Sequence, residues 1–137
     1  MYLAWHDVHD PLQAPASFHR PPHYNDSNRA RLTLNAMVRV HDEAMRNVTD
    51  VLHSTGLWPA TLLVWSADNG GWLRDMGGTS NYPLRGGKKG SFEGGIRVPA
   101  ALGGGWLPSP LRGSASGAVV HLADWCVGCS VFCPVCR

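Results

Sequence analysis

Apolar residues recur at steps of three and four between residues 27 and 54, which is the spacing of one face of a helix. The residues of this stripe are Ala36, Met37, Val40, Ala44, Val48, Val51 and Leu52. The pattern predicts one long amphipathic helix over residues 27–54. Asp26 or Ser27 can cap its start, and Gly56 is expected to end it.

Three short apolar segments, at residues 2–5, 61–66 and 96–102, predict β-strands. Residues 62–65 are continuously apolar, which is typical of a strand covered on both faces. A strand before a long helix and another after it form a βαβ arrangement, which favours a parallel sheet. We therefore expect an α/β fold, with a mostly parallel sheet and the helix packed on one face.

Polar side chains follow two of these predicted strands. Asp68 and Asn69 come directly after residues 61–66, where open α/β sheets place their ligands. Their oxygens are the hard donors that calcium or magnesium prefers. After residues 2–5 come two histidines and two aspartates, namely His6, Asp7, His9 and Asp10. This second group could bind a metal, although its spacing alone favours an ordinary polar exit from a strand.

The segment 70–95 is rich in glycine and carries three cations, Arg85, Lys88 and Lys89. Glycine lets the backbone pass close to a ligand, and the cations can meet an anion. The sequence therefore places candidate metal ligands and candidate anion ligands on one connection.

The composition limits the classes of partner. The chain has 137 residues, of which 44% are hydrophobic, and this suits one globular domain. A net charge of +2 argues against nucleic acid or an anionic membrane as a partner. No apolar run approaches the ~20 residues that a membrane span requires. Residues 1–9 lack the pattern of a signal peptide, so we expect either an internal start or a cytosolic chain.

The last residues differ from the rest. The four cysteines, Cys126, Cys129, Cys133 and Cys136, form two CxxC pairs separated by three residues. Zinc sites built from such pairs usually have a dozen or more residues between them. A metal site and a disulfide pair are two open alternatives for these cysteines. We favour a third interpretation, a tail that arose by accident, for example through a frameshift. We expect two parts, a domain over 1–125 and a cysteine-rich divergent tail over 126–137.

Several motifs together resemble the sulfatase family of the alkaline phosphatase superfamily, and most of all its arylsulfatase B-type branch. They are SADNGG at 66–71, NYPLRGGKKGSFEGGIRVPA at 81–100, AWHDVHDPLQAP at 4–15 and HLADW at 121–125. The resemblance implies a partial alkaline-phosphatase-like domain, hydrolysis of sulfate esters, and calcium as the cofactor. Relatives of this branch work in the lysosome or the secretory pathway, and the branch suggests sulfated glycosaminoglycan sugars as substrates.

The resemblance also assigns roles to residues. Asp68 and Asn69 match two calcium ligands. His9 matches a histidine that faces the sulfate group, and Lys88 matches the lysine that binds it, with Lys89 as a neighbouring alternative. We expect His9, Lys88, Asp68 and Asn69 to meet in one cleft. Two glycosylation sequons occur, at Asn25 and Asn47, and Asn47 lies where the family carries Asn-Val-Thr.

Other parts of the family's machinery are missing from this sequence. The family's nucleophile is a formylglycine made from Cys or Ser in a C/S-x-P-x-R motif, and no such motif occurs here. The family's Asp-Asp calcium pair is also absent. We therefore name no catalytic residue and expect an incomplete sulfatase that is inactive alone and exposes apolar surface. Two alternatives stay open: a non-catalytic module that binds sulfated glycans, and a small metal-binding protein that uses the cysteine tail.

Overall fold

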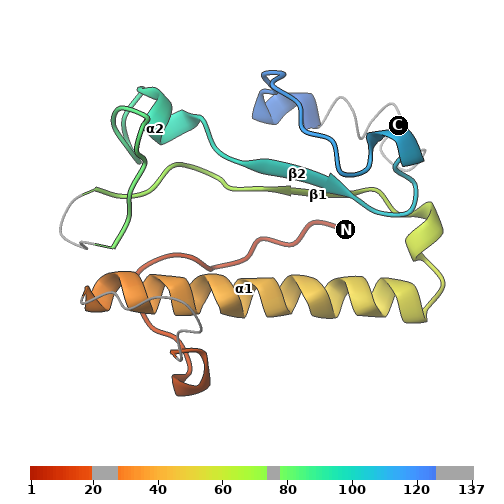
Figure 1. The fold of residues 1–137 in the computed structure, drawn as a ribbon, viewed down its shortest axis with the longest axis horizontal. Helices are drawn as coiled ribbons and strands as arrows, with labels where there is room; N and C mark the ends of the chain where they lie inside the picture. Colours follow the sequence, from red (N-terminus) through yellow and green to blue (C-terminus); the bar gives the residue numbers. More distant parts are fainter. Residues whose placement is uncertain (20–27, 74–77, 126–137) are drawn as a thin grey trace. The chain divides into compact units, whose positions relative to one another are not determined.

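The structure, a computed structural model, describes residues 1–19, 28–73 and 78–125 (Figure 1). The chain forms two compact units, and the second begins at Pro108. The first unit holds helices α1 (Arg29–Ser54) and α2 (Glu93–Ile96) and strands β1 (Leu63–Ser66) and β2 (Ala100–Gly103). Short 3-10 turns lie at Ala16–Phe18, Trp58–Ala60 and Ser109–Leu111. The cysteine tail lies outside the described residues, so the division at residue 125 stays a prediction.

Helix α1 confirms the long helix that the apolar period predicts. It begins two residues later than expected, after Asn28, whose side chain accepts a hydrogen bond from the Arg31 amide at 3.1 Å. Asn28 is therefore the cap, whereas the expected caps, residues 26 and 27, lie outside the described residues. At the other end Gly56 has φ 71°, and its amide donates to His53 O at 3.1 Å. With the Leu57 amide donating to Leu52 O at 2.9 Å, this is a Schellman motif, and it confirms that Gly56 ends the helix.

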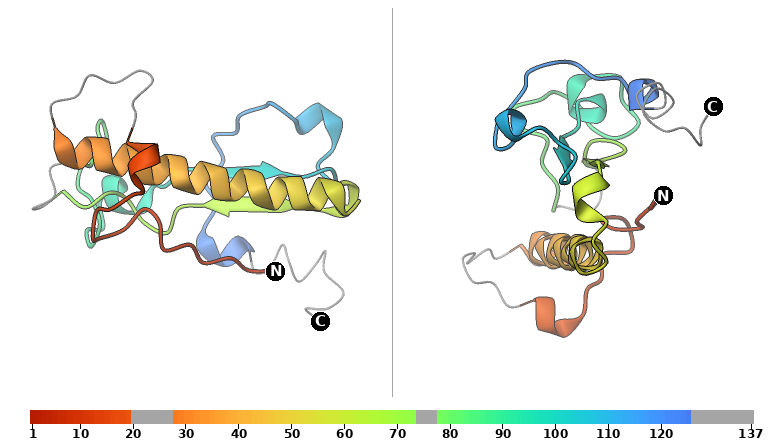
Figure 2. Two further views of the ribbon diagram at one scale, coloured as in Figure 1. Left: turned by 90° about the horizontal axis from the view of Figure 1, so that it is seen from below. Right: turned by 90° about the vertical axis from the view of Figure 1, so that its right-hand side faces the viewer.

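The apolar stripe of α1 is covered along most of its length. Ala36 and Met37 are 1% and 2% exposed, and they are the buried apolar residues of the described part of the chain. Val51 is 59% exposed, so the expectation that it packs inward is wrong. Neighbouring helix residues point in directions about 100° apart, and here Leu52 takes the half-buried position instead. Figure 2 shows the N-terminal segment running alongside α1.

The two strands pair antiparallel, with Leu63 opposite Gly103 and Ser66 opposite Ala100. The expected parallel pairing is therefore wrong for these strands, and residues 2–5 lie outside any strand. The reason lies in the connection, which leaves β1 at its carboxyl end and enters β2 at the same end. A parallel neighbour would require a crossover to the opposite end. Backbone hydrogen bonds continue past the strands, from Gly70 to Gly95 at 3.0 Å.

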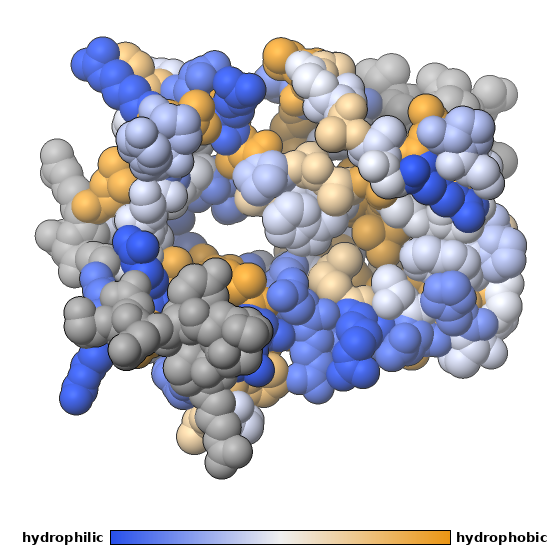
Figure 3. Space-filling view, viewed as in Figure 1, coloured by the Kyte–Doolittle hydropathy of each residue, from blue (hydrophilic) through white to orange (hydrophobic). Residues whose placement is uncertain are grey.

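Strand β1 is covered on one face and not on two, contrary to the expectation from its continuous apolar run. Leu63 and Trp65 are half-buried, whereas Leu62 and Val64 are 41% and 39% exposed. Leu102 of β2 is 48% exposed, so the expected exposed apolar surface is present. Apolar residues also appear among polar ones on the face seen in Figure 3.

A histidine joins the helix to the strand pair. The Trp65 indole Nε1 donates to His41 Nε2 at 2.9 Å, and Trp5 meets the same imidazole edge-to-face, with ring centroids 5.5 Å apart. Trp5 belongs to the N-terminal segment, His41 to α1 and Trp65 to β1. These contacts of His41 tie the N-terminal segment, α1 and β1 together, so the helix is not isolated from the sheet.

Candidate functional site

The candidate calcium ligands lie where β1 ends. Asp68 is exposed, and Asn69 is half-buried. The Asn69 side-chain Nδ2 donates to Gly70 O at 3.0 Å, and its Oδ1, the atom that could bind a cation, takes no part in this bond. The strand therefore presents two oxygen-bearing side chains in succession at its carboxyl end, as the sequence predicts.

The structure brings His9 and Lys88 together from positions 79 residues apart. Lys88 Nζ lies 3.0 Å from His9 Nε2, and His9 Nδ1 lies 3.2 Å from the carbonyl oxygen of Asp10. A carbonyl oxygen can only accept, so these partners assign the imidazole proton to Nδ1. Nε2 then accepts from the lysine ammonium. We call these two residues the His9–Lys88 pair.

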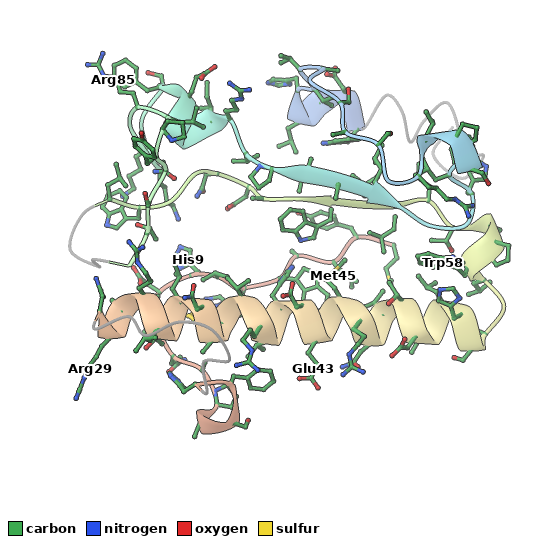
Figure 4. The ribbon with its side chains drawn as sticks, in the orientation of Figure 1. His9, Arg29, Glu43, Met45, Trp58 and Arg85 are labelled. Atoms are coloured by element: carbon green, nitrogen blue, oxygen red, sulfur yellow. The ribbon has the colours of Figure 1, made fainter. Side chains whose placement is uncertain are left out.

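The other two cations of the loop are held elsewhere. The Arg85 guanidinium carbon lies 4.1 Å from the centroid of the Phe92 ring, and Lys89 Nζ lies 4.9 Å from that of Trp72. Lys89 also has φ 70°, a left-handed conformation that is uncommon outside glycine. Figure 4 shows Arg85 at the outer side of the loop, pointing away from His9. The structure thus separates Lys88 from Lys89, which the sequence left as alternatives.

The backbone joins the two halves of the candidate site. The Lys88 amide donates to Gly71 O at 3.1 Å, and Gly71 follows Asn69 by two residues. The segment that carries the candidate calcium ligands therefore runs beside the segment that carries the lysine.

Asp68 and Asn69 carry the type of oxygen donor that calcium prefers, but they supply too few donors to complete a calcium site. A carboxylate and an amide oxygen are hard donors, but calcium takes six to eight oxygen ligands. In the part of the chain that the structure describes, no group of three or more His, Cys, Asp or Glu residues could hold a metal ion. Asp68 and Asn69 are therefore at most part of a calcium site.

Two residues of this region were given no role by the family motifs. His6 meets His9 edge-to-face, with ring centroids 5.6 Å apart, although it matched nothing functional. Asn81 binds the backbone of the glycine-rich segment through its side chain. Its position two residues before Pro83, next to Ser80 among turn-forming residues, is a signal that could have drawn attention to it.

Other predicted features stand apart from this region or outside the described residues. Asn47 is exposed on α1, and its role as a glycan acceptor stays a prediction. Asn25 and the four cysteines lie outside the described residues. Within residues 1–19, 28–73 and 78–125, none of the helices combines the length and apolar character of a membrane span.

Comparison with known proteins identifies the family. The sulfatase family model matches residues 1–102, so the chain belongs to the sulfatase family. Arylsulfatase J of Mus musculus is 39% identical over 131 residues, which is 91% of this chain and 20% of that protein. The family resemblance of the sequence motifs is thereby confirmed.

A solved structure agrees with this assignment. It is the crystal structure of Ps i-CgsB in complex with k-i-k-neocarrahexaose, and it matches with a TM-score of 0.63 and 35% identity. The match covers 70% of this chain and 21% of that chain. The chain therefore spans about a fifth of the length of these relatives, and its membership implies the alkaline-phosphatase-like α/β fold.

Proposed function

We propose that this chain is part of a calcium-dependent sulfatase and supplies the side of the active site that holds the sulfate group. One observation carries the proposal: Lys88 Nζ and His9 Nε2 lie 3.0 Å apart on different segments of the chain. The Lys88 ammonium has three N–H donors, so it can donate to His9 Nε2 and to a sulfate oxygen at once, and His9 Nε2 can donate to the sulfate as well when the imidazole carries a second proton. Hydrogen bonds to an anion from charged donors are roughly twice as strong as neutral ones.

Calcium is the proposed cofactor, with Asp68 and Asn69 supplying two of its oxygen ligands. When bound, the ion would stabilise negative charge on the sulfate ester. The Gly71 carbonyl that accepts from the Lys88 amide keeps the two ligands and the lysine on adjoining backbone segments. The proximity of these backbone segments supports recognition of one anion by the lysine and the cation together.

We further propose a sulfated sugar as the substrate, in line with the arylsulfatase B-type branch and its glycosaminoglycans. The matching crystal structure holds k-i-k-neocarrahexaose, an oligosaccharide, and this supports a glycan. The matching curated protein bears the name Arylsulfatase J, and this supports cleavage of a sulfate ester.

Binding of a sulfated oligosaccharide tests the proposal, and the chain offers a matched control. We expect Lys88→Ala to weaken binding about tenfold or more, because one charge-assisted hydrogen bond is lost. Lys89→Ala removes the same charge from the next residue, but Lys89 lies over Trp72. We expect it to change affinity by less than about threefold, because exposed charges are screened by salt.

Titration calorimetry in calcium-containing buffer measures both variants, with an unsulfated oligosaccharide as the ligand control. Equal losses of affinity in the two lysine variants would show that the effect comes from net charge alone. That result would contradict the assignment of Lys88 as the sulfate-binding lysine. Equal binding of sulfated and unsulfated sugar would contradict sulfate recognition itself.

Turnover should be undetectable with this chain alone, because its sequence contains no formylglycine precursor motif. An assay with a chromogenic aryl sulfate in the presence of calcium measures this. Turnover that Asp68→Ala abolishes would show that another residue of the chain acts as the nucleophile, and the proposal would then have to be revised.

A further inference from the structure

The glycine-rich segment packs backbone against backbone, without room for side chains. A Cβ added at Gly87 would lie 2.5 Å from Gly71 O, and one at Gly94 would lie 2.7 Å from Arg85 O. Real Cβ atoms essentially never approach other atoms so closely. Polar backbone groups enclosed in such a region need partners, because an unpaired buried group costs about as much as a lost hydrogen bond.

The Asn81 side chain supplies several of these partners. Its Oδ1 accepts from the Gly71 amide at 2.8 Å, and its Nδ2 donates to Gly71 O at 2.9 Å and to Gly86 O at 3.1 Å. Both donors and the acceptor of the carboxamide are used. Asn81 thus pairs with both polar groups of Gly71, as the backbone of a neighbouring strand would.

These bonds surround Lys88. Gly86 precedes it by two residues, and Gly71 O also accepts from the Lys88 amide at 3.1 Å. Asn81 therefore holds Gly86, which lies two residues before Lys88. It also holds Gly71, whose carbonyl oxygen binds the Lys88 amide. The lysine side chain then extends from this anchored point to His9.

We propose that Asn81 is a positioning residue that holds Lys88 against His9 and beside the segment of Asp68 and Asn69. The inference rests on the proposed function only in assigning sulfate as the ligand of the His9–Lys88 pair. Its structural content, that the pair depends on the Asn81 carboxamide, can be tested without any ligand.

Nitrogen-15 NMR of the histidine side chains in the full chain provides the test. The His9 Nε2 resonance reports its hydrogen bond with Lys88, and the His41 Nε2 resonance reports the separate bond from Trp65. Lys88→Met shows where the His9 resonance lies once the pair is lost. We expect Asn81→Ala to move the His9 resonance to that same position and to leave the His41 resonance unchanged.

Two further variants sharpen the result. Asn81→Asp keeps an acceptor for the Gly71 amide but loses both donors, so it should also lose the His9 signature. Tyr82→Ala is the control, because Tyr82 is the next residue, is 92% exposed and has no side-chain partner in the described part of the chain. It should leave both histidine resonances in place.

An unchanged His9 resonance in Asn81→Ala would overturn the inference. A loss of both the His9 and His41 signatures in Asn81→Ala and Asn81→Asp would also overturn it, because Asn81 would then be a general stability residue. Addition of a sulfated oligosaccharide to the wild type separates the two proposals. If His9 depends on Asn81 but does not respond to the sugar, the proposed function fails and the positioning role stands.

Discussion

Gly70→Ala is expected to destabilise the first unit by about 3 kcal/mol or more. A Cβ at this position would overlap the carbonyl oxygen of Gly94 and lie 2.8 Å from its carbonyl carbon. These are backbone atoms, so they cannot move aside as the end of a flexible side chain can. The two segments would have to separate, which would break the hydrogen bond from Gly70 N to Gly95 O.

Gly103→Ala is the matched control. Gly103 lies in β2, which pairs with β1, but a Cβ there meets nothing within 4 Å and its φ is not positive. We expect its free energy of unfolding to stay within about 0.5 kcal/mol of the wild type. Urea unfolding followed by tryptophan fluorescence measures both variants. Equal stabilities would mean that residues 70 and 94 do not pack as closely as described.

The sequence pattern located α1 and β1 well, but it expected a strand at residues 2–5 that is absent and began the strand of 96–102 at Ile96, which lies in α2. It also could not assign strand direction. The period of the apolar residues predicted α1 to within two residues, because a helix buries one stripe whatever its neighbours are. Strand direction carries no such signature. It follows from the path of residues 67–99, which return to the end of β1 that they left, and this path depends on long-range contacts among glycines.

Burial of β1 was over-predicted for a related reason. A continuous apolar run shows that a strand can be covered on both faces, but coverage depends on what lies against it. In the described residues the face of Trp65 meets His41, and the face of Val64 stays exposed. Sequence reasoning also missed the part that a polar residue, His41, plays in the contact between helix and strand.

The candidate site, like the fold, could be predicted from the sequence only in part. Family motifs brought out His9 and Lys88, and the structure places their side-chain nitrogens 3.0 Å apart. The motifs could not separate Lys88 from Lys89, because the choice rests on the backbone conformation of Lys89 and on the ring of Trp72. Asn81 was missed because a side chain that bonds only to backbone groups leaves no pattern of charge or apolar spacing.

Met37→Ala is expected to lower the stability of the first unit by about 2–5 kcal/mol. Met37 is 2% exposed and is the larger of the two buried apolar residues in the described chain. It lines a hollow of about 390 Å³ between α1 and the N-terminal segment, and that hollow is also lined by Asp7, Gln13, Ala14, Pro15 and Val40. Truncating the side chain would enlarge the hollow and remove contacts between the helix and the segment that carries His9.

The variant should therefore affect the candidate site from a distance. Once the N-terminal segment loses the Met37 contact with α1, His9 is held less firmly beside Lys88, and we expect weaker binding of a sulfated oligosaccharide as well. Val38→Ala is the control, because Val38 is the next helix residue and is 43% exposed. It should cost less than about 1 kcal/mol and leave the His9 resonance unchanged. Urea unfolding and the nitrogen-15 signal of His9 measure the two effects, and a Met37→Ala variant as stable as Val38→Ala would show that this packing does not hold the segment.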